Sequence, residues 1–266
     1  MLKKKYFKIT CFVFIILLFI LLILFISNKL INKITFENTI IPFAQKNQNT
    51  IFSIDECIFF SSCNVKNSTS SSTNFTFENL YQYTDIALFI NNNSRDFNLE
   101  NTLKNVKITN IKFDLLPSLG APNLYYKNLS EFAKNTINDN NLISNNELIF
   151  NITSDDNTSL DTPTLYNNCA NPIVLSYINQ NIKTDYTITD TSKSITYDGS
   201  LLKTCGVLLN TISSTISFDI YITNNLNQEF KSTIYLDIPL EESNTSIYNG
   251  SIISKQNTNY KFYRYK

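Results

Sequence analysis

The sequence predicts a mainly β protein, in which an N-terminal transmembrane helix precedes an antiparallel, Ig-like β-sandwich. Two observations lead to this prediction. The apolar run Ile9–Ile26 contains one clearly polar residue, Thr10, and is long enough to cross a membrane. Beyond it, short runs of β-branched and aromatic residues alternate with turn-forming segments, which is typical of sandwiches.

The apolar run is interpreted as an uncleaved anchor. The predicted parts are a cytoplasmic N-terminus at 1–8, a transmembrane helix at 9–28 and a stalk at 29–49, where Pro42 discourages a helix. A cleaved signal peptide is the alternative, but its apolar region is usually about 7 to 15 residues long and ends at small residues.

Charge is distributed unevenly and predicts orientation. Lysines concentrate before the apolar run, which favours a cytoplasmic N-terminus and an extracytoplasmic C-terminal domain. They are Lys3, Lys4, Lys5 and Lys8, against Lys29 and Lys33 after the run. From Asn47 onward, 15 lysines and arginines stand against 21 aspartates and glutamates. Such an acidic domain argues against nucleic-acid binding.

The β-rich domain is predicted at 50–242. Its strand candidates are Thr50–Val65, Asp85–Ile90, Val106–Leu116, Glu147–Thr153, Ile173–Ile178, Tyr186–Thr189 and Ser194–Tyr197. The apolar alternation slips at Asn110, which indicates a β-bulge. Asn67–Asn74 is predicted to be a loop, and Asp198-Gly199 indicates a hairpin turn.

The clearest pattern is a hairpin. Apolar residues recur at alternate positions over Ile216–Ile222 and Phe230–Leu240, on either side of the turn segment Asn224–Gln228. This predicts two antiparallel strands with one buried face. The positions expected to face outward are Ser217, Asp219, Lys231, Thr233, Tyr235 and Asp237.

Domain boundaries are less sharply marked. The acidic segment 154–164, which contains Pro163, is the best candidate for a split, so the sequence predicts either one sandwich or two. The only soluble helix predicted begins with Ser130 as N-cap and runs towards Ile137. Residues 243–266 are predicted to be a C-terminal tail or an edge strand.

The absence of histidine excludes Ser-His and Cys-His nucleophiles and His-ligated zinc. No catalytic residue, cofactor or metal site is therefore predicted, and the protein is expected not to be an enzyme. A carboxylate-dependent hydrolase is a less favoured alternative. Adjacent carboxylates such as Asp155-Asp156 and Glu241-Glu242 point to opposite faces of an extended chain.

Oxygen side chains occupy every second position at Asp155, Asn157, Ser159 and Asp161, as in loops that wrap Ca²⁺. However, Leu160 and Tyr166 stand where a helix-flanked calcium loop has Gly and Glu. The segment is interpreted as an exposed acidic turn.

Of the five cysteines, Cys11 lies in the apolar run and four lie beyond it. Cys57 and Cys63 are too far apart on one straight strand to bond to each other. A disulfide between Cys169 and Cys205 is easier to build, although four partly buried free thiols are the favoured interpretation.

The C-terminal segment alternates cations with aromatic residues. Lys261, Tyr263, Arg264 and Tyr265 could contact an anionic wall polymer, lipid headgroups or a partner protein. A last edge strand or a tail is the simpler interpretation.

Several short segments of the sequence resemble those of an uncharacterised family of single-pass membrane proteins from low-GC Gram-positive bacteria. They are Tyr83–Ala87, Asn123–Asn128, Cys169–Ile173, Asp198–Leu202, Asn224–Leu226 and Ile238–Leu240. The resemblance covers roughly residues 40 to 240. It implies an anchor followed by an extracytoplasmic domain, and it brings no activity, ligand or site.

The functional hypothesis is a non-catalytic binding or structural protein of the cell envelope. It would hold to the membrane through residues 9–28, and its β-domain would contact another protein or a wall component. The alternative is an accessory or sensor subunit of a membrane complex, in which the helix itself would carry part of an interface.

Overall fold

The computed structural model describes residues 2–35, 50–71, 74–93, 102–144, 147–153, 163–166, 172–190, 192, 194–238, 241 and 246–264. They belong to two units, Met1–Asn49 and Thr50–Lys266.

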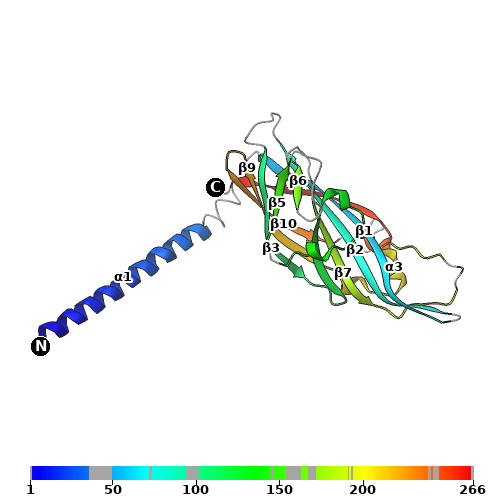
Figure 1. Ribbon diagram of the computed structural model, residues 1–266, viewed down its shortest axis with the longest axis horizontal. Coiled ribbons are helices and arrows are strands. Elements are labelled where there is room, and N and C mark those ends of the chain that lie inside the picture. Colours follow the sequence, from blue (N-terminus) through cyan, green and yellow to red (C-terminus); the bar gives the residue numbers. More distant parts are fainter. Residues whose placement is uncertain are drawn as a thin grey trace. The chain divides into compact units, whose positions relative to one another are not determined.

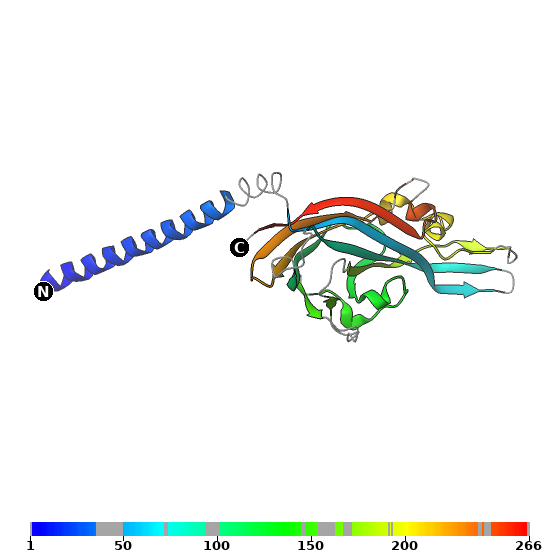
Figure 2. The same cartoon turned by 90° about the horizontal axis from the view of Figure 1, so that it is seen from above.

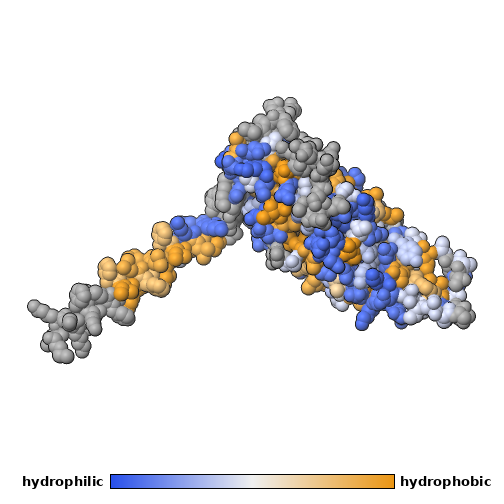
Figure 3. Space-filling model, viewed as in Figure 1, coloured by the Kyte–Doolittle hydropathy of each residue, from blue (hydrophilic) through white to orange (hydrophobic). Residues whose placement is uncertain are grey.

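The first unit contains one long helix, α1 (Leu2–Thr35). Within its section Phe14–Thr35, an 18-residue stretch has a mean hydropathy of 2.8, and none of that stretch is buried inside the protein. Figure 3 shows the apolar surface of this helix. By length and composition this helix could cross a membrane, a property that it shares with signal sequences. The helix extends beyond the predicted membrane segment 9–28 at both ends. Residues 29–35, assigned to the stalk, are helical and contain neither Gly nor Pro.

The second unit consists of two six-stranded sheets, which confirms the predicted β-sandwich class (Figure 1). In sheet A the order is β11–β1–β2–β7–β4, and β8 pairs with the end of β2; in sheet B it is β12–β10–β9–β3–β5–β6. All pairs are antiparallel except β5 and β6. The strands of sheet A are β1 (Phe52–Ser70), β2 (Phe75–Asn92), β4 (Ala121–Lys127), β7 (Pro172–Lys183), β8 (Thr187–Ile188) and β11 (Ile253–Lys261). Those of sheet B are β3 (Leu103–Leu115), β5 (Glu147–Thr153), β6 (Thr164–Tyr166), β9 (Thr215–Asn224), β10 (Glu229–Asp237) and β12 (Tyr263–Arg264).

In the described parts of the connections between these strands, the helices are single turns. They are η2 (Leu129–Glu131), η3 (Asp139–Asn141), α3 (Ser200–Thr204), α4 (Leu209–Ile212) and η4 (Ile247–Asn249). The core fills the space between the sheets with alternate residues of each strand. Phe52 of sheet A meets Phe230 of sheet B edge-on at 5.3 Å between ring centroids, and Phe113 lies 6.3 Å from Tyr177.

Strands from both sides of the segment 154–164 share each sheet. Sheet A joins β1, β2 and β4 to β7 and β11, while sheet B joins β3 and β5 to β9 and β10. The structure therefore has one sandwich, Thr50–Lys266, rather than two that divide at this segment.

The C-terminal segment closes one side of the sandwich. β11 runs beside β1 in sheet A (Figure 2), and after Phe262 the chain enters sheet B as β12. Phe262 is buried, and its N–H donates to the Phe52 carbonyl at 3.1 Å. The Tyr260 hydroxyl also bonds to the backbone N–H and C=O of Tyr235 on β10. Of the two predictions for this segment, the described residues form the edge strand.

The predicted hairpin is confirmed as β9 and β10, with the expected turn and buried face. The bulge at Asn110 is also confirmed. The register between β3 and β9 shifts between Thr109 and Lys112, and Asn110 has a φ of 55°. Ser217 and Asp219 lie on the outer face, in alternation with the core residues of β9, but both are buried there.

Asp219 is buried because its carboxylate is fully engaged on the outer face of sheet B. It accepts from Thr233 Oγ1 at 2.6 Å and Asn110 Nδ2 at 2.7 Å, and Lys231 Nζ lies 3.1 Å away. Burial acts to raise the pKa of Asp219, but these hydrogen bonds and the lysine charge outweigh it and lower the pKa. Burial likewise acts to lower the pKa of Lys231, and Asp219 reverses that shift.

Two further local predictions were wrong near α3. Ser194–Tyr197 does not form a strand, and Asp198-Gly199 does not turn a hairpin. Instead the Asp198 carboxylate accepts from the Ser200 N–H at 2.8 Å and starts α3. Gly199 is needed because a Cβ at that position would lie 2.1 Å from the Ile247 carbonyl oxygen. The predicted loop Asn67–Asn74 is also shorter, since β1 continues to Ser70.

Candidate functional site

The outer face of sheet A holds a buried ion pair. Lys127 of β4 lies 2.9 Å and 3.0 Å from the two carboxylate oxygens of Asp85 on β2. The side chains are 5% and 4% exposed, respectively. Ser176 of β7, which lies between these strands, donates its hydroxyl to Asp85 Oδ1 at 2.6 Å. A buried charge pair is tolerated only where its remaining hydrogen-bonding positions are filled.

The connector between β4 and β5 fills those positions. The Ala133 N–H donates to Asp85 Oδ2 at 2.9 Å, and Lys127 Nζ donates to the Lys134 carbonyl at 2.6 Å. Ala133 adopts a left-handed φ of 64° to do this. The helix predicted from Ser130 to Ile137 was therefore wrong. Only the turn η2 forms, because the backbone beyond it is used to satisfy the ion pair.

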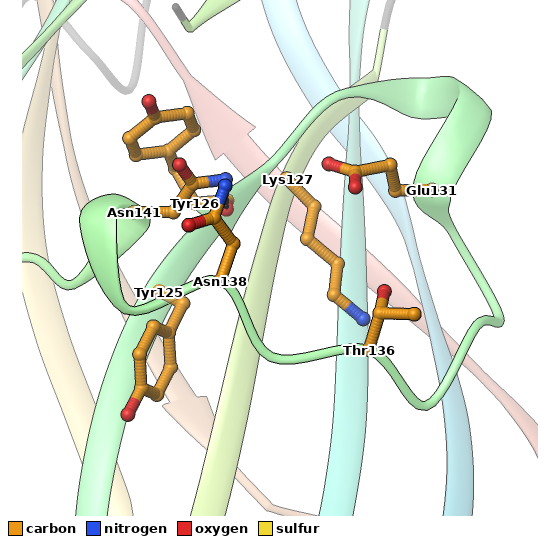
Figure 4. Close-up of a pocket in the computed structure, with 7 residues that line it drawn as sticks. All are labelled: Tyr125, Tyr126, Lys127, Glu131, Thr136, Asn138 and Asn141. Carbon is orange, nitrogen blue, oxygen red and sulfur yellow. Dashed lines mark hydrogen bonds between the residues drawn. The ribbon is translucent and has the colours of Figure 1, made fainter. Parts of the chain in front are cut away.

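A small pocket lies under the connector beside this pair (Figure 4). It has room for about 10 Å³, which is close to the space that one water molecule needs. Its lining residues are Tyr125, Tyr126, Lys127, Glu131, Thr136, Asn138 and Asn141. The Lys127 side chain points towards Thr136 and away from Glu131, in keeping with its bonds to Asp85 and Lys134.

Two oxygen atoms of the pocket are unsatisfied acceptors. Within the part of the chain that the structure describes, neither Glu131 Oε2 nor Asn141 Oδ1 has a hydrogen-bond partner, although both atoms are buried. The Asn141 side chain is 2% exposed, and its Nδ2 donates to the Tyr126 carbonyl at 3.3 Å. That bond fixes which end of the amide is the oxygen. Two acceptor atoms are therefore left without donors among the described residues, on side chains that line the pocket.

Three tyrosines lie on the same outer face, and we call Tyr81, Tyr83 and Tyr125 the tyrosine face. Of the three, Tyr125 is buried and lines the pocket. The rings of Tyr81 and Tyr83 lie 6.3 Å apart at 49°, and both side chains are partly exposed. The Tyr125 hydroxyl accepts from Gln180 Nε2 at 3.4 Å. Burial is the main reason that the pKa of Tyr83 and that of Tyr125 are raised; Tyr81 adds to the shift of Tyr83, and the Asp139 carboxylate adds to that of Tyr125.

The charged groups of this region are engaged with one another. The carboxylate of Asp85 and the ammonium of Lys127 bond to each other and to their neighbours. The pocket is lined by one carboxylate, that of Glu131, among its seven residues. Among the described residues, no three His, Cys, Asp or Glu side chains come together as they would around a metal ion.

The cysteines predicted from sequence lie elsewhere. Cys205 is a buried free thiol whose pKa burial raises to about 11, and Cys169 lies outside the described residues. Their disulfide stays a prediction. Cys57 and Cys63 are also buried free thiols on β1, and burial is the main reason that the pKa of each is raised.

The C-terminal residues do not form one contact surface. Lys261 and Arg264 are exposed, but Tyr263 is buried where β12 pairs with β10. Tyr265 lies outside the described residues, as do Asp155, Asn157, Ser159 and Asp161 of the acidic segment.

The ion pair and the pocket were not predicted from the sequence. Asp85 begins the apolar run Asp85–Ile90, and Lys127 ends the aromatic strand β4. A charged residue in such a run indicates that an oppositely charged side chain is buried beside it. Which residue that is depends on the order of the strands in the sheet, and one sequence does not show this order. Comparison of the chain with known protein families, curated proteins and solved structures gave no match.

Proposed function

We propose that this protein is a membrane-anchored binding protein of the cell envelope, with its N-terminus in the cytoplasm and its β-sandwich outside. The observation that carries the proposal is the helix section Phe14–Thr35, which is strongly apolar and entirely unburied by the protein. A surface of this kind is stable in lipid but not in water. Lys3, Lys4, Lys5 and Lys8 support the orientation.

The binding role is supported by the site described above. Its charged groups are engaged with one another, whereas two residues that line its pocket, Glu131 and Asn141, each hold a buried oxygen without a donor among the described residues. The tyrosine face combines apolar rings with hydroxyl groups, a composition common at binding surfaces.

Cysteine labelling tests the orientation in intact cells. Ser68 is exposed near the tip of the β1–β2 hairpin, so Ser68→Cys would present a thiol on the domain, whereas Lys3→Cys would present one at the N-terminus. Both variants are made in a background in which the native cysteines are replaced by serine or alanine. A membrane-impermeant maleimide should label the first before lysis and the second only after lysis.

Two other results would contradict the proposal. Labelling of Ser68→Cys only after lysis would place the domain in the cytoplasm. A domain found in the medium without residues 1–35 would identify the apolar helix as a cleaved signal peptide.

A further inference from the structure

The buried pair of Asp85 and Lys127 brings together the two groups from which an amide can form. Lys127 Nζ lies 2.9 Å and 3.0 Å from the two carboxylate oxygens. Because each oxygen is about 1.2 Å from Cγ, Nζ lies within roughly 3.4 Å of that carbon, a separation from which an amine can attack. The side chains are only 5% and 4% exposed, so little water competes for either group.

Amide formation needs the uncharged forms of both groups, and the pair can reach them without outside help. A proton passes from Nζ to a carboxylate oxygen along a hydrogen bond that is already present. Burial favours this transfer, because a site away from water destabilises two charges relative to an amine and a carboxylic acid. An exposed pair such as Lys112 and Asp114 gains nothing from it, since water solvates both charges.

Two hydrogen-bond donors lie where negative charge would develop on Asp85. The Ser176 hydroxyl donates to Oδ1 at 2.6 Å, and the Ala133 N–H donates to Oδ2 at 2.9 Å. When the Lys127 amine attacks Cγ, these donors would stabilise the oxygens of the tetrahedral intermediate. The Lys134 carbonyl accepts from Nζ at 2.6 Å and holds the amine beside the carboxyl group.

The adjoining pocket has room for the water molecule that the reaction would release. Lys127 lines this pocket, whose volume of about 10 Å³ is close to the space that one water needs. Glu131 and Asn141 line it too, and each holds a buried oxygen for which the described part of the chain supplies no donor. A water molecule released inside the domain could donate one hydrogen bond to each of these oxygens.

We propose that Asp85 and Lys127 join in an intramolecular isopeptide bond, which forms without an enzyme or a cofactor. The bond between Nζ and Cγ forms, and one bond between Cγ and oxygen breaks. That oxygen leaves as water with two of the three ammonium protons. The third proton stays on the amide nitrogen and keeps its hydrogen bond to the Lys134 carbonyl. No atom changes its oxidation state, so the step needs neither an oxidant nor a reductant.

The bond would fasten β2 to β4 across β7 and close a loop between residues 42 apart in the sequence. A covalent link of this kind restricts the unfolded chain as a disulfide does. It would do so in a domain in which Cys57, Cys63 and Cys205 are free thiols. The inference depends on residues of the sandwich alone, so it stands or falls separately from the envelope location.

Mass spectrometry of the full chain, purified in detergent and then denatured, tests the proposal. The intact mass should be lower than the mass of the sequence by one water molecule. Trypsin should release the peptides 67–95 and 113–134 as one branched species, because an acylated Lys127 is no longer a cleavage site. The exposed Lys112 and Asp114 are the internal control, and trypsin should cleave after Lys112 as usual.

An unchanged intact mass, with 113–127 released as a separate peptide, overturns the proposal. Matched variants locate the bond. Lys127→Arg keeps a positive charge but has no amine, so it should keep its full mass. Asp85→Asn should still form the link, with loss of ammonia in place of water, because the amide nitrogen is then the leaving group. A loss of water that persists in Lys127→Arg would come from another part of the chain and would also overturn the proposal.

Discussion

Asp85 and Lys127 are charged side chains that the sandwich keeps away from water. The geometry places three donors around the carboxylate and three acceptors around the ammonium, so the cost of burial is offset only while the whole set is intact. Removing one partner leaves the other charge buried and alone.

Lys127→Met should therefore destabilise the domain by about 3 to 5 kcal/mol. Lys112→Met is the matched control, because the Lys112–Asp114 pair is exposed and screened by solvent, so its loss should hardly move the unfolding midpoint. Urea unfolding of residues 50–266 measures both. Equal midpoints for the two variants would mean that the buried pair has no special role in stability.

Asp219 makes the stability of the folded domain depend on pH. Its folded pKa lies below the ordinary value of 3.8, so its contribution to stability is present at higher pH and is lost as the pH falls through the folded pKa. The Asp219→Asn variant should be clearly less stable than the native domain near pH 6. Near pH 3 the difference in stability between the two should be much smaller. Urea midpoints at the two pH values test this. Asp185→Asn, at an exposed position, is the control and should shift neither midpoint strongly.

Among the elements, the short helix α3 depends on close contact with η4. A Cβ at residue 199 would lie 2.1 Å from the Ile247 carbonyl oxygen, so the backbone of one turn would have to move. Gly199→Ala should destabilise the domain by about 1 to 3 kcal/mol, the usual cost of overpacking. Thermal unfolding measures it, and an unchanged midpoint would contradict the close approach seen here.

Sequence predicted the elements whose pattern is local. The alternation in β9 and β10, the slip at Asn110 and the apolar run of α1 each report a single element, and the structure has all three. Prediction from the sequence failed where contacts with a residue far away in the chain determine the local backbone conformation. The segment after Ser130 has helical propensity, but Ala133 and Lys134 give their backbone groups to Asp85 and Lys127 instead. Those bonds depend on how β2, β7 and β4 are ordered.

The same reasoning explains why the candidate site escaped prediction. The pocket combines the end of β4 with a connector whose path is set by the ion pair. The tyrosine face adds two residues from β2, with β7 between the strands. No spacing in the sequence displays that arrangement, whereas the sandwich class itself follows from repeated short strands.

At the scale of the whole domain, the sharing of strands predicts how a cut chain behaves. Proteolysis of residues 50–266 between 154 and 164 should leave two fragments that stay together on gel filtration, in the presence of reductant, because each contributes strands to both sheets. Mass spectrometry identifies the cut. Two fragments that separate and remain folded would show that each half is stable alone.

The pairing of β1 with β11 has a consequence for biosynthesis. Thr258 Oγ1 donates to the Ile54 carbonyl across 204 residues of sequence, so one edge of the first strand stays uncovered until β11, near the end of the chain, arrives. If the domain is exported as proposed, β1 would emerge early and would expose unpaired backbone groups to other chains until β11 followed. Folding would then start only after nearly the whole domain had been translocated, and a holding chaperone on the far side of the membrane would protect yield more than it would speed folding.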